Sequence, residues 1–595
     1  MFFGDSGRRL NKLDVMIMLC ITVLYGFIGF YKLGSLDVPQ TAWYPDRNEV
    51  ISIYSDEPFD TVRYYCGIVC DEPNQDSKVG VEMNFTVSKD GSWWTDAGSS
   101  ENFAFFQWRD YGLNKSVNYL KIKNYGTTVV NEIVLLSSED GHYVDYEVVE
   151  GSDAIHDEFD KVPENVTYYD GGYFDEVYYP RTVVELMNGS NPFEMTHPPL
   201  GKYIMLLGVL VFGLNPFGWR FMGVVAGIVA VPCLYHLCKR LTGKTWLASF
   251  GALLFCFEGM HYVMMRIGTL DVFVFLFVML MYDTMLCFMQ KDIEHDGLAG
   301  CWLPLSLSGL FFGLGAATKW NAVYGGLGLA LLYFGKLVVS YRSLTFDVDD
   351  SRLSNRKVKE LKKQFRERKY GVMNQCVSIS FGCIVFFILV PFLVYMLSFI
   401  PVWLSGEYHD WSFFDAFVGM QKSMYGYHSG LDSEHTYQSM WYEWPIMQVP
   451  MLFSNHVSGD LQSKIMCMGN PAIWLLGLLG FVAVGVLAFL KKKQECVFIF
   501  IGGLSVYLPW MLISRITFIY HYFPMVLFLV LSMVVLCNVM KESGGRRVLN
   551  VGVAELCSFG VLGLCLVGFC TYFCVFSGFT ASKSYIDAIM SVFNR

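Results

Sequence analysis

Two adjacent carboxylic acids, Asp175 and Glu176, are the strongest candidates for chemistry in this sequence. They lie in the segment 168–205, which reads YYDGGYFDEVYYPRTVVELMNGSNPFEMTHPPLGKYIM, and aromatic residues flank the pair. A carboxylate can act as a general base toward a hydroxyl nucleophile. Burial beside aromatic rings would raise its pKa, whereas a nearby cation would lower it. On spacing alone, a solvated surface pair is the more common arrangement, so the pair needs support from its surroundings.

Several charged residues near the ends of apolar stretches form a second group of candidates. His197, in the rigid turn HPP, can position the acidic pair. Arg266 and Asp271 flank the short turn RIGTLD and form either a functional pair or a structural salt bridge between two helices. Lys319, in ATKWN, is either a site cation or an interfacial anchor. Lys202 is expected to anchor its helix near lipid headgroups.

A third candidate segment, residues 424–445, reads MYGYHSGLDSEHTYQSMWYEWP. His428 and His435 are candidates to line a substrate groove, whereas Trp441 and Trp444 are explained by an aromatic belt at a membrane surface. The two histidines lack a convincing metal spacing, and the sequence has no CxxC pair or HExxH motif, so we predict no structural metal. We also find no glycine-rich loop of the kind that binds nucleotide phosphates.

The elements that must position these residues are mainly membrane helices. Of 595 residues, 53% are hydrophobic and 16% charged, against about 25% charged in ordinary soluble chains. Apolar runs of about 18 or more residues predict membrane-spanning helices. We predict eleven spans, near 14–33, 219–238, 246–264, 271–290, 302–318, 321–341, 374–403, 470–490, 495–513, 516–538 and 551–577.

The positions of Lys and Arg predict the orientation of these spans, because basic residues collect on the cytoplasmic side. The loop 342–373 alone has ten basic and five acidic residues. Residues 200–214 are apolar but short. Counting them as a span would place the later clusters of Lys and Arg on the outer side, so we predict an interfacial or re-entrant helix on the outer face. The N-terminus is then cytoplasmic and the C-terminus outside, with a first helix that is not cleaved. The clusters that agree are Arg8/Arg9/Lys12, Lys239/Arg240/Lys244, the 342–373 loop, Lys491–Lys493 and Lys541/Arg546/Arg547.

The large first outer loop contains a segment of different composition. Residues 34–200 carry 30 acidic and 10 basic residues, which argues against nucleic acid as a partner. Between 38 and 165, alternating β-branched runs separated by turn residues predict an all-β sandwich, either of carbohydrate-binding type or a spacer without ligand. SKDGSW predicts a hairpin turn, and Trp93, Trp94 and Trp108 are either sugar-stacking or, more commonly, buried. Cys66 and Cys70 are either a disulfide or two free thiols.

The predicted organisation therefore has six parts, as follows. They are an N-terminal segment with the first helix (1–37), the β insert (38–165), an outer loop with the acidic pair (166–218), helices two to seven with the basic loop (219–403), a second large outer loop (404–469) and helices eight to eleven (470–595).

The order FDEVYY, THPPLGK, WRFMGVVAG, RIGTLD and ATKW resembles the protein O-mannosyltransferase family, glycosyltransferase family 39. GNPAIW and YLPWMLISRITFIYHYFP resemble its bacterial members, and the resemblance covers nearly everything except the β insert. It implies a type C glycosyltransferase fold of about eleven helices with a site on the outer face. It also implies an inverting transfer of mannose from a polyprenyl monophosphate to Ser or Thr, with no nucleotide sugar or other cofactor.

The resemblance also implies roles for single residues. Asp175 would accept the proton of the acceptor hydroxyl, and Glu176 would orient the acceptor or hold the pair in place. Arg220 matches an arginine that meets the lipid phosphate, with a snorkelling interfacial arginine as the alternative. Arg515 is a second candidate for the phosphate.

Three other functions stay open at this point. The acceptor could be a lipid or a cell-wall polymer, or the chain could be a non-catalytic membrane scaffold whose β domain binds sugar. A transporter should show repeated halves with broken helices, and no internal repeat is visible. The resemblance to bacterial members implies a bacterial plasma membrane and an exported polypeptide as partner. It leaves the sugar, the oligomeric state and the ligand of the insert undetermined.

Overall fold

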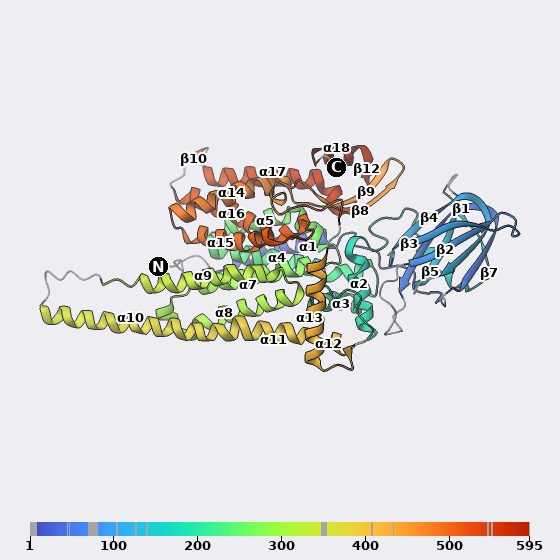
Figure 1. The fold of residues 1–595 in the computed structure, drawn as a ribbon. Coiled ribbons are helices and arrows are strands. Elements are labelled where there is room, and N and C mark those ends of the chain that lie inside the picture. Colours follow the sequence, from blue (N-terminus) through green and yellow to red (C-terminus); the bar gives the residue numbers. More distant parts are fainter. Residues whose placement is uncertain are drawn as a thin grey trace.

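The computed structural model describes residues 9–593 except 45, 47, 69–80, 103–104, 125–127, 138–140, 347–353, 406–407, 432–433, 544–546 and 549–550. Arg8, Cys70 and Arg546, used above, lie outside these residues. A bundle of long helices forms the body of the molecule, a β domain lies at one end, and one helix projects beyond the bundle at the other end (Figure 1). Cys66 is a buried free thiol.

The described part of the chain has ten helices that are long and apolar enough to span a membrane, or eleven if one bent pair counts as a span. Ten of the eleven predicted spans coincide with such helices, and the bent pair lies at the predicted third span. They are α1 Lys12–Phe30, α4 Pro216–Thr242, the pair α5 Thr245–Cys256 and α6 Gly259–Met265, α7 Asp271–Met289, α8 Ile293–Thr318, α9 Ala322–Arg342, the continuous α10 Asn355–Ile384, α11 Val390–Ser398 and α12 Ile400–Trp403, α14 Pro471–Leu490, α15 Gln494–Tyr507, α16 Phe523–Glu542 and α17 Val553–Ser577.

The third span is broken, whereas we predicted one helix over 246–264. Helices α5 and α6 meet at an angle of 63°. Glu258 lies at the break, and its carboxylate accepts hydrogen bonds from the backbone N–H of His261 at 2.6 Å and from the indole of Trp474 at 2.9 Å. A side chain that caps the second helix satisfies N–H groups that the break would otherwise leave without partners. The break directs the residues after α6 toward the acidic pair.

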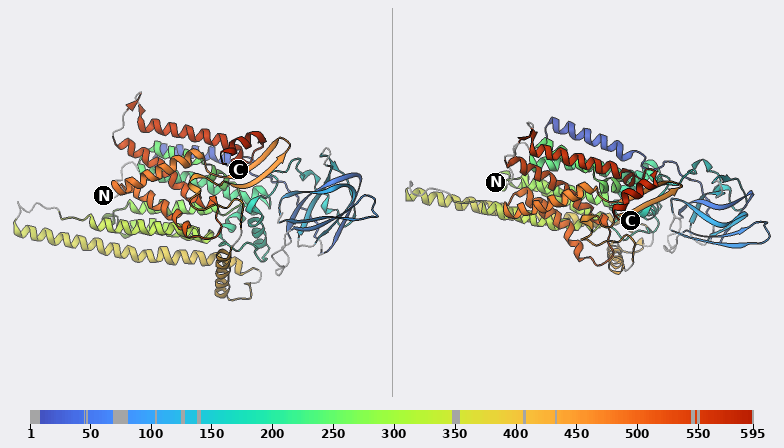
Figure 2. Two further views of the ribbon diagram at one scale, coloured as in Figure 1. Left: turned by 45° about the horizontal axis from the view of Figure 1, so that its top comes forward. Right: turned by 90° about the horizontal axis from the view of Figure 1, so that it is seen from above.

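Much of the predicted basic loop 342–373 is helical. Helix α10 begins at Asn355, so its basic first half continues directly into the membrane-spanning half. Lys, Arg, Glu, Gln and Leu dominate residues 355–368, and all of them have high helix propensity. Both views of Figure 2 show α10 extending beyond the ends of its neighbours.

The insert is all-β, as predicted, but its strands pair as one antiparallel sheet rather than as two separate sheets of a sandwich. The sheet order is β3-β2-β4-β1-β5-β6, with β7 on β1. Register shifts interrupt the pairing of the long central strands. The SKDGSW turn joins β2 to β3, with Gly91 at φ 76°. The strands are β1 Val50–Ile68, β2 Val81–Ser88, β3 Thr95–Asn102, β4 Trp108–Asn124, β5 Thr128–Leu136, β6 Tyr143–Val144 and β7 Glu147–Glu150.

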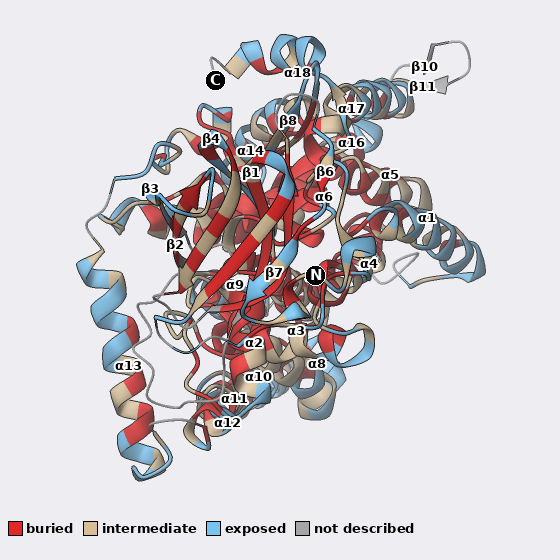
Figure 3. Cartoon of the chain, turned by 90° about the vertical axis from the view of Figure 1, so that its right-hand side faces the viewer, coloured by how far each residue is buried: buried red, intermediate tan, exposed pale blue. Residues whose placement is uncertain are grey.

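The sheet packs firmly on the segment that carries the acidic pair. Its apolar core is continuous with α2 Tyr179–Met187 and α3 Leu200–Phe212, through side chains that include Tyr179 and Met205. Trp108 is buried in this core, whereas Trp93 is 83% exposed. Figure 3, which looks onto the sheet, shows long buried stretches in its strands; residues 129–136 of β5 and 62–67 of β1 are buried without a break. The short apolar stretch 200–214 is thus a short helix, as expected.

The second loop contains α13 Phe413–Gly430 and the strands β8 Met451–Ser458 and β9 Leu461–Cys467. These strands form a small sheet with β12 Ala581–Ser582, which follows α17 and precedes α18 Lys583–Met590. The prediction that Trp444 belongs to an aromatic belt is wrong. Its side chain is completely buried, and its ring packs against Trp510 and His521 with centroids 5.6 and 5.9 Å away. Trp444 therefore supports the loop 508–522 rather than facing lipid.

Candidate active site

Glu176 is locked in a buried ion pair. A short 3-10 helix, Phe174–Val177, places it beneath the outer loop. Its carboxylate accepts from Nε and Nη2 of Arg220 at 2.8 and 2.6 Å, and from the backbone N–H groups of Gly268 and Tyr173 at 2.7 and 3.1 Å. Both side chains of the ion pair are fully buried. Glu176 thus joins the acidic loop to α4 and to the turn after α6.

Arg220 does not face an open site, in contrast to the predicted contact with a lipid phosphate. Its guanidinium has five N–H groups. Two donate to Glu176, and the other three donate to the carbonyl oxygens of Leu33, Tyr168 and Gly171 at 2.7–3.0 Å. All five are used, so a phosphate could bind only after this network is broken. The geometry favours a positioning role for Arg220.

Asp175, the other member of the pair, has a free carboxylate: no described residue forms a hydrogen bond with it. Burial raises its pKa to about 7, and the neighbouring Lys319 opposes the rise, whereas Asp271 and Glu194 add to it. Adjacent residues therefore have opposite environments, one carboxylate fully satisfied and the other free. A carboxyl group whose pKa lies near neutral is suited to accept a proton.

Lys319, at the end of α8, is the cation whose charge opposes the rise in the pKa of Asp175. Its ammonium lies 2.9 and 3.0 Å from the two carboxylate oxygens of Asp271 and 5.6 Å from the ring centroid of Tyr520. The predicted pairing of Arg266 with Asp271 is wrong. Arg266 instead donates to the carbonyl oxygens of Gly29, Tyr31 and Lys32, and so holds the end of α1.

The HPPLGK segment forms a second buried cluster around Glu194. The ammonium of Lys202 lies 2.5 Å from one carboxylate oxygen of Glu194, and Nδ1 of His197 lies 2.9 Å from the other. Although burial raises the pKa of Glu194, these two partners bring it below its usual value. Burial lowers the pKa of His197. Lys202 is fully buried, so the prediction of a headgroup anchor is wrong.

A cavity of about 350 Å³ lies beside these clusters. His197 and Lys319 line it from one side, and α13 and the loop after α15 close it from the other. Arg515 also lines it and pairs with no carboxylate among the described residues, so it offers a free positive charge. Its lining residues are Thr196, His197, Pro198, Lys319, Trp320, Asn321, Tyr324, Tyr425, His428, Ser429, Trp510, Leu512, Ile513, Ser514, Arg515 and His521.

An exposed apolar side chain borders the cavity, because Leu512 lines it and is 81% exposed. A cation at the edge of an apolar surface suits the phosphate of a lipid. His435, a predicted candidate, does not line this cavity. It is exposed, and its ring packs on Phe518 with centroids 5.1 Å apart.

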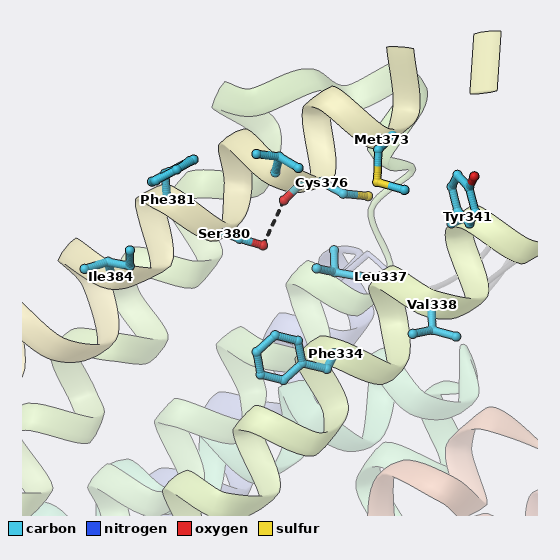
Figure 4. Close-up of a pocket in the computed structure, with 10 residues that line it drawn as sticks. Phe334, Leu337, Val338, Tyr341, Met373, Cys376, Ser380, Phe381 and Ile384 are labelled. Carbon is cyan, nitrogen blue, oxygen red and sulfur yellow. Dashed lines mark hydrogen bonds between the residues drawn. The ribbon is translucent and has the colours of Figure 1, made fainter. Parts of the chain in front are cut away.

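A second cavity, of about 440 Å³, lies between α9 and α10 and has a different character (Figure 4). Its wall is formed by Phe334, Leu337 and Phe381 with other apolar side chains, and Ser380 turns its hydroxyl to the carbonyl oxygen of Cys376. It has no charged lining residue, so it cannot hold a sugar phosphate. No group of three or more His, Cys, Asp or Glu side chains in the described residues could hold a metal ion.

Sequence reasoning missed several residues of the first cavity. Trp320, Asn321 and Trp510 lie within the quoted segments ATKWN and YLPWMLISRITFIYHYFP but were given no role, and Tyr324 and Glu194 were not singled out. The available signal was the position of polar and aromatic residues immediately after an apolar span. That signal occurs at many membrane surfaces without a site.

Two family models match the chain. Residues 196–346 match the dolichyl-phosphate-mannose-protein mannosyltransferase model, and residues 413–590 match the model of the C-terminal four-helix membrane region of protein O-mannosyltransferases. The chain belongs to the protein O-mannosyltransferase family. It is a multi-pass membrane protein with the type C glycosyltransferase fold.

Individual relatives share about a quarter or less of their residues with this chain over the aligned part. A polyprenol-phosphate-mannose–protein mannosyltransferase of Mycobacterium tuberculosis is 25% identical over 461 residues, which cover 69% of this chain and 84% of the relative. One of Corynebacterium glutamicum is 22% identical, with 67% and 80% covered. A solved structure, the S. cerevisiae protein O-mannosyltransferase Pmt1–Pmt2 complex bound to the sugar donor, has a TM-score of 0.57 at 12% identity, with 70% and 88% covered.

The matched ranges of the family models contain every lining residue of the 350 Å³ cavity. Asp175, Glu176 and the β insert precede both ranges. In this O-mannosyltransferase, the ion pair of Glu176 with Arg220 therefore ties the acidic loop to a helix of the matched region.

Proposed function

We propose that this protein transfers mannose from a polyprenyl-phosphate carrier to Ser or Thr hydroxyls of polypeptides, with inversion at the anomeric carbon. The observation that carries the proposal is the free Asp175 carboxylate. It has a pKa raised to about 7 and lies close to Lys319, which lines a cavity that also contains the free cation Arg515. Membership of the family supports the donor and acceptor classes.

In the proposed step, the acceptor hydroxyl oxygen attacks the anomeric carbon as Asp175 takes up the hydroxyl proton. A new C–O bond to the acceptor forms, and the bond between the anomeric carbon and the phosphate oxygen breaks. The polyprenyl phosphate leaves with the bonding electrons. General-base catalysis of this kind contributes about 10²–10⁴-fold to a rate.

The cations of the cavity have separate roles in this proposal. Arg515 binds the lipid phosphate, because its guanidinium stays charged and can form two parallel hydrogen bonds. Lys319 adds positive potential on the inner side, where negative charge develops on the leaving group. Arg220 acts through Glu176 and holds the loop of Asp175 in position.

We place the site on the outer face of a bacterial plasma membrane. The basic clusters put the N-terminus and the extension of α10 in the cytoplasm. The acidic pair, the β insert and the second loop then face the outside, where an exported polypeptide meets the lipid-linked sugar. In this orientation α3 lies at the outer interface.

Product analysis with purified protein tests this function. Polyprenyl-phosphate [³H]mannose is incubated with a Thr-rich peptide, with membrane lipids or with cell-wall polymer. We expect label in the peptide and the α/β configuration opposite to that of the donor. Label in lipid or polymer alone would identify a different acceptor, and no transfer to any acceptor would support the scaffold instead.

A further inference from the structure

Two hydrogen-bond acceptors in the wall of the 350 Å³ cavity have no donor. They are Oδ1 of Asn321 and Nδ1 of His428, and each is buried without a hydrogen-bond partner among the described residues. Both residues line the cavity. Buried polar atoms are nearly always paired, so an unpaired atom in a cavity wall points to a partner such as a ligand.

The protonation of His428 follows from its other nitrogen. Nε2 lies 2.8 Å from the carbonyl oxygen of Thr196, and because a carbonyl can only accept, Nε2 carries the hydrogen. Burial lowers the pKa of His428 to about 4, and the neighbouring His197 and Arg515 contribute to the lowering. The imidazole is therefore neutral at pH 7, and its Nδ1 presents a lone pair.

Asn321 lacks its usual local partner. It occupies the N-cap position of α9, where an Asn side chain normally accepts a hydrogen bond from the helix backbone. Its side chain makes no such bond here. The side-chain oxygen of Asn321 therefore accepts no hydrogen bond from the first backbone N–H groups of α9 and remains available to a ligand.

Aromatic rings complete the wall around the two acceptors. Trp320 lies beside His428 with ring centroids 5.7 Å apart, and Tyr324 meets Trp510 edge-on at 5.3 Å. The indole of Trp320 donates to the hydroxyl of Tyr395 at 2.9 Å, which fixes its plane. Flat apolar faces with a few fixed polar atoms are typical of small-ligand sites.

We propose that Asn321 and His428 accept hydrogen bonds from hydroxyl groups of the transferred hexose and thereby select the sugar. A hexose supplies what this wall lacks, since its hydroxyls are donors and its C–H faces can lie against Trp320. Arg515 at the lipid side then holds the phosphate of the same donor. This inference rests on the proposed glycosyl transfer and adds which residues read the sugar.

The inference is tested with donors that lack single hydroxyls. The value of kcat/KM is measured for polyprenyl-phosphate mannose and its 2-, 3-, 4- and 6-deoxy analogues, with wild type, Asn321→Leu and His428→Phe. We expect the kcat/KM of wild type to be about 10–100-fold lower for the analogue that lacks a recognised hydroxyl, because one buried acceptor is left unpaired. The variant that lacks the acceptor for this hydroxyl should have a lower kcat/KM for the mannose donor. It should have similar kcat/KM values for the mannose donor and the deoxy analogue.

Three control variants distinguish the loss of one hydrogen bond from a general disturbance of the cavity. Asn321→Asp and His428→Gln keep an acceptor atom and should keep most of the selectivity, and Ser380→Ala, in the wall of the other cavity, should leave it unchanged. Equal losses by Asn321→Leu and His428→Phe on every donor would overturn the inference, as would a change confined to the KM of the peptide. If wild type transfers no hexose from any donor, the proposed function itself fails.

Discussion

The Glu176 carboxylate and the Arg220 guanidinium form a fully buried bidentate ion pair that joins the acidic loop to α4. The pair gives two adjacent acids different tasks. Glu176 has its charge and its hydrogen bonds satisfied, whereas its neighbour Asp175 is left with a free carboxylate and a raised pKa. The two residues should therefore respond differently to substitution.

Glu176→Gln should destabilise the protein, because the buried charge of Arg220 loses its partner. Breaking a buried pair by removing one charge costs about 3–5 kcal/mol. We expect a marked decrease in the thermal midpoint of the detergent-solubilised protein, measured by intrinsic fluorescence. Glu542→Gln is the control, since its ion pair with Lys493 is partly exposed and its loss should cost at most about 1 kcal/mol. A Glu176→Gln protein as stable as wild type and fully active would rule out the positioning role.

Activity should rise with pH through about 7. Asp175 must be ionised to accept a proton, and its pKa is about 7. The value of kcat/KM should therefore fall about tenfold per pH unit below that point and level off above it. Because the pKa in the folded protein is raised from 3.8 to about 7, the stability from protonated Asp175 is fully present below about pH 4 and is lost as the pH rises from there through 7. A rate that is independent of pH between 5 and 8 would contradict the assignment.

Arg515→Gln should weaken donor binding without unfolding the protein. Arg515 is partly exposed at the edge of the cavity and has no carboxylate partner among the described residues, so its loss leaves no buried charge behind. A charged hydrogen bond to a phosphate is worth about 1.5–3 kcal/mol, which corresponds to about 10–150-fold in the KM of the donor. Arg515→Lys should recover part of this loss. An unchanged donor KM in Arg515→Gln would assign the phosphate to another group.

Two neighbouring glycines test whether the β insert supports the acidic loop. A Cβ on Gly171 would lie 2.7 Å from Cα of Gln107 and 3.0 Å from the carbonyl oxygen of Phe106, both in the insert. A Cβ on Gly172 would be at least 3.5 Å from every neighbour. We therefore expect Gly171→Ala to lower both stability and transfer rate, and Gly172→Ala to stay within about 1 kcal/mol of wild type. Equal behaviour of the two variants would show that the insert does not fix the loop.

Much of the architecture could be predicted from the sequence. A long apolar run in a membrane forms a helix, because a helix satisfies every backbone hydrogen bond within the segment. The insert was predictable from its strand periodicity, as was the SKDGSW hairpin. The break at Glu258 was not, because it depends on donors from Asn470 and Trp474, more than 200 residues away. Long-range contacts of this kind leave no local pattern.

The site shows the same division. The acidic pair was predictable as a candidate. The different environments of its two carboxylates were not, since they depend on which carboxylate binds Arg220. Arg266 and Asp271 were expected to pair because they are close in sequence, yet Asp271 binds Lys319 across a helix interface. Of the two acceptors, His428 was a candidate from the sequence, whereas Asn321 becomes visible only in the structure, which brings it into the same cavity wall.

The most direct test of the account is the transfer rate of Asp175→Asn under saturating donor and peptide. Asn keeps the size of the side chain but cannot accept the hydroxyl proton. The account predicts a decrease of about 10²–10⁴-fold in kcat with a thermal midpoint no lower than that of wild type. A variant that folds normally and transfers mannose at the wild-type rate would contradict the central claim that Asp175 is the base.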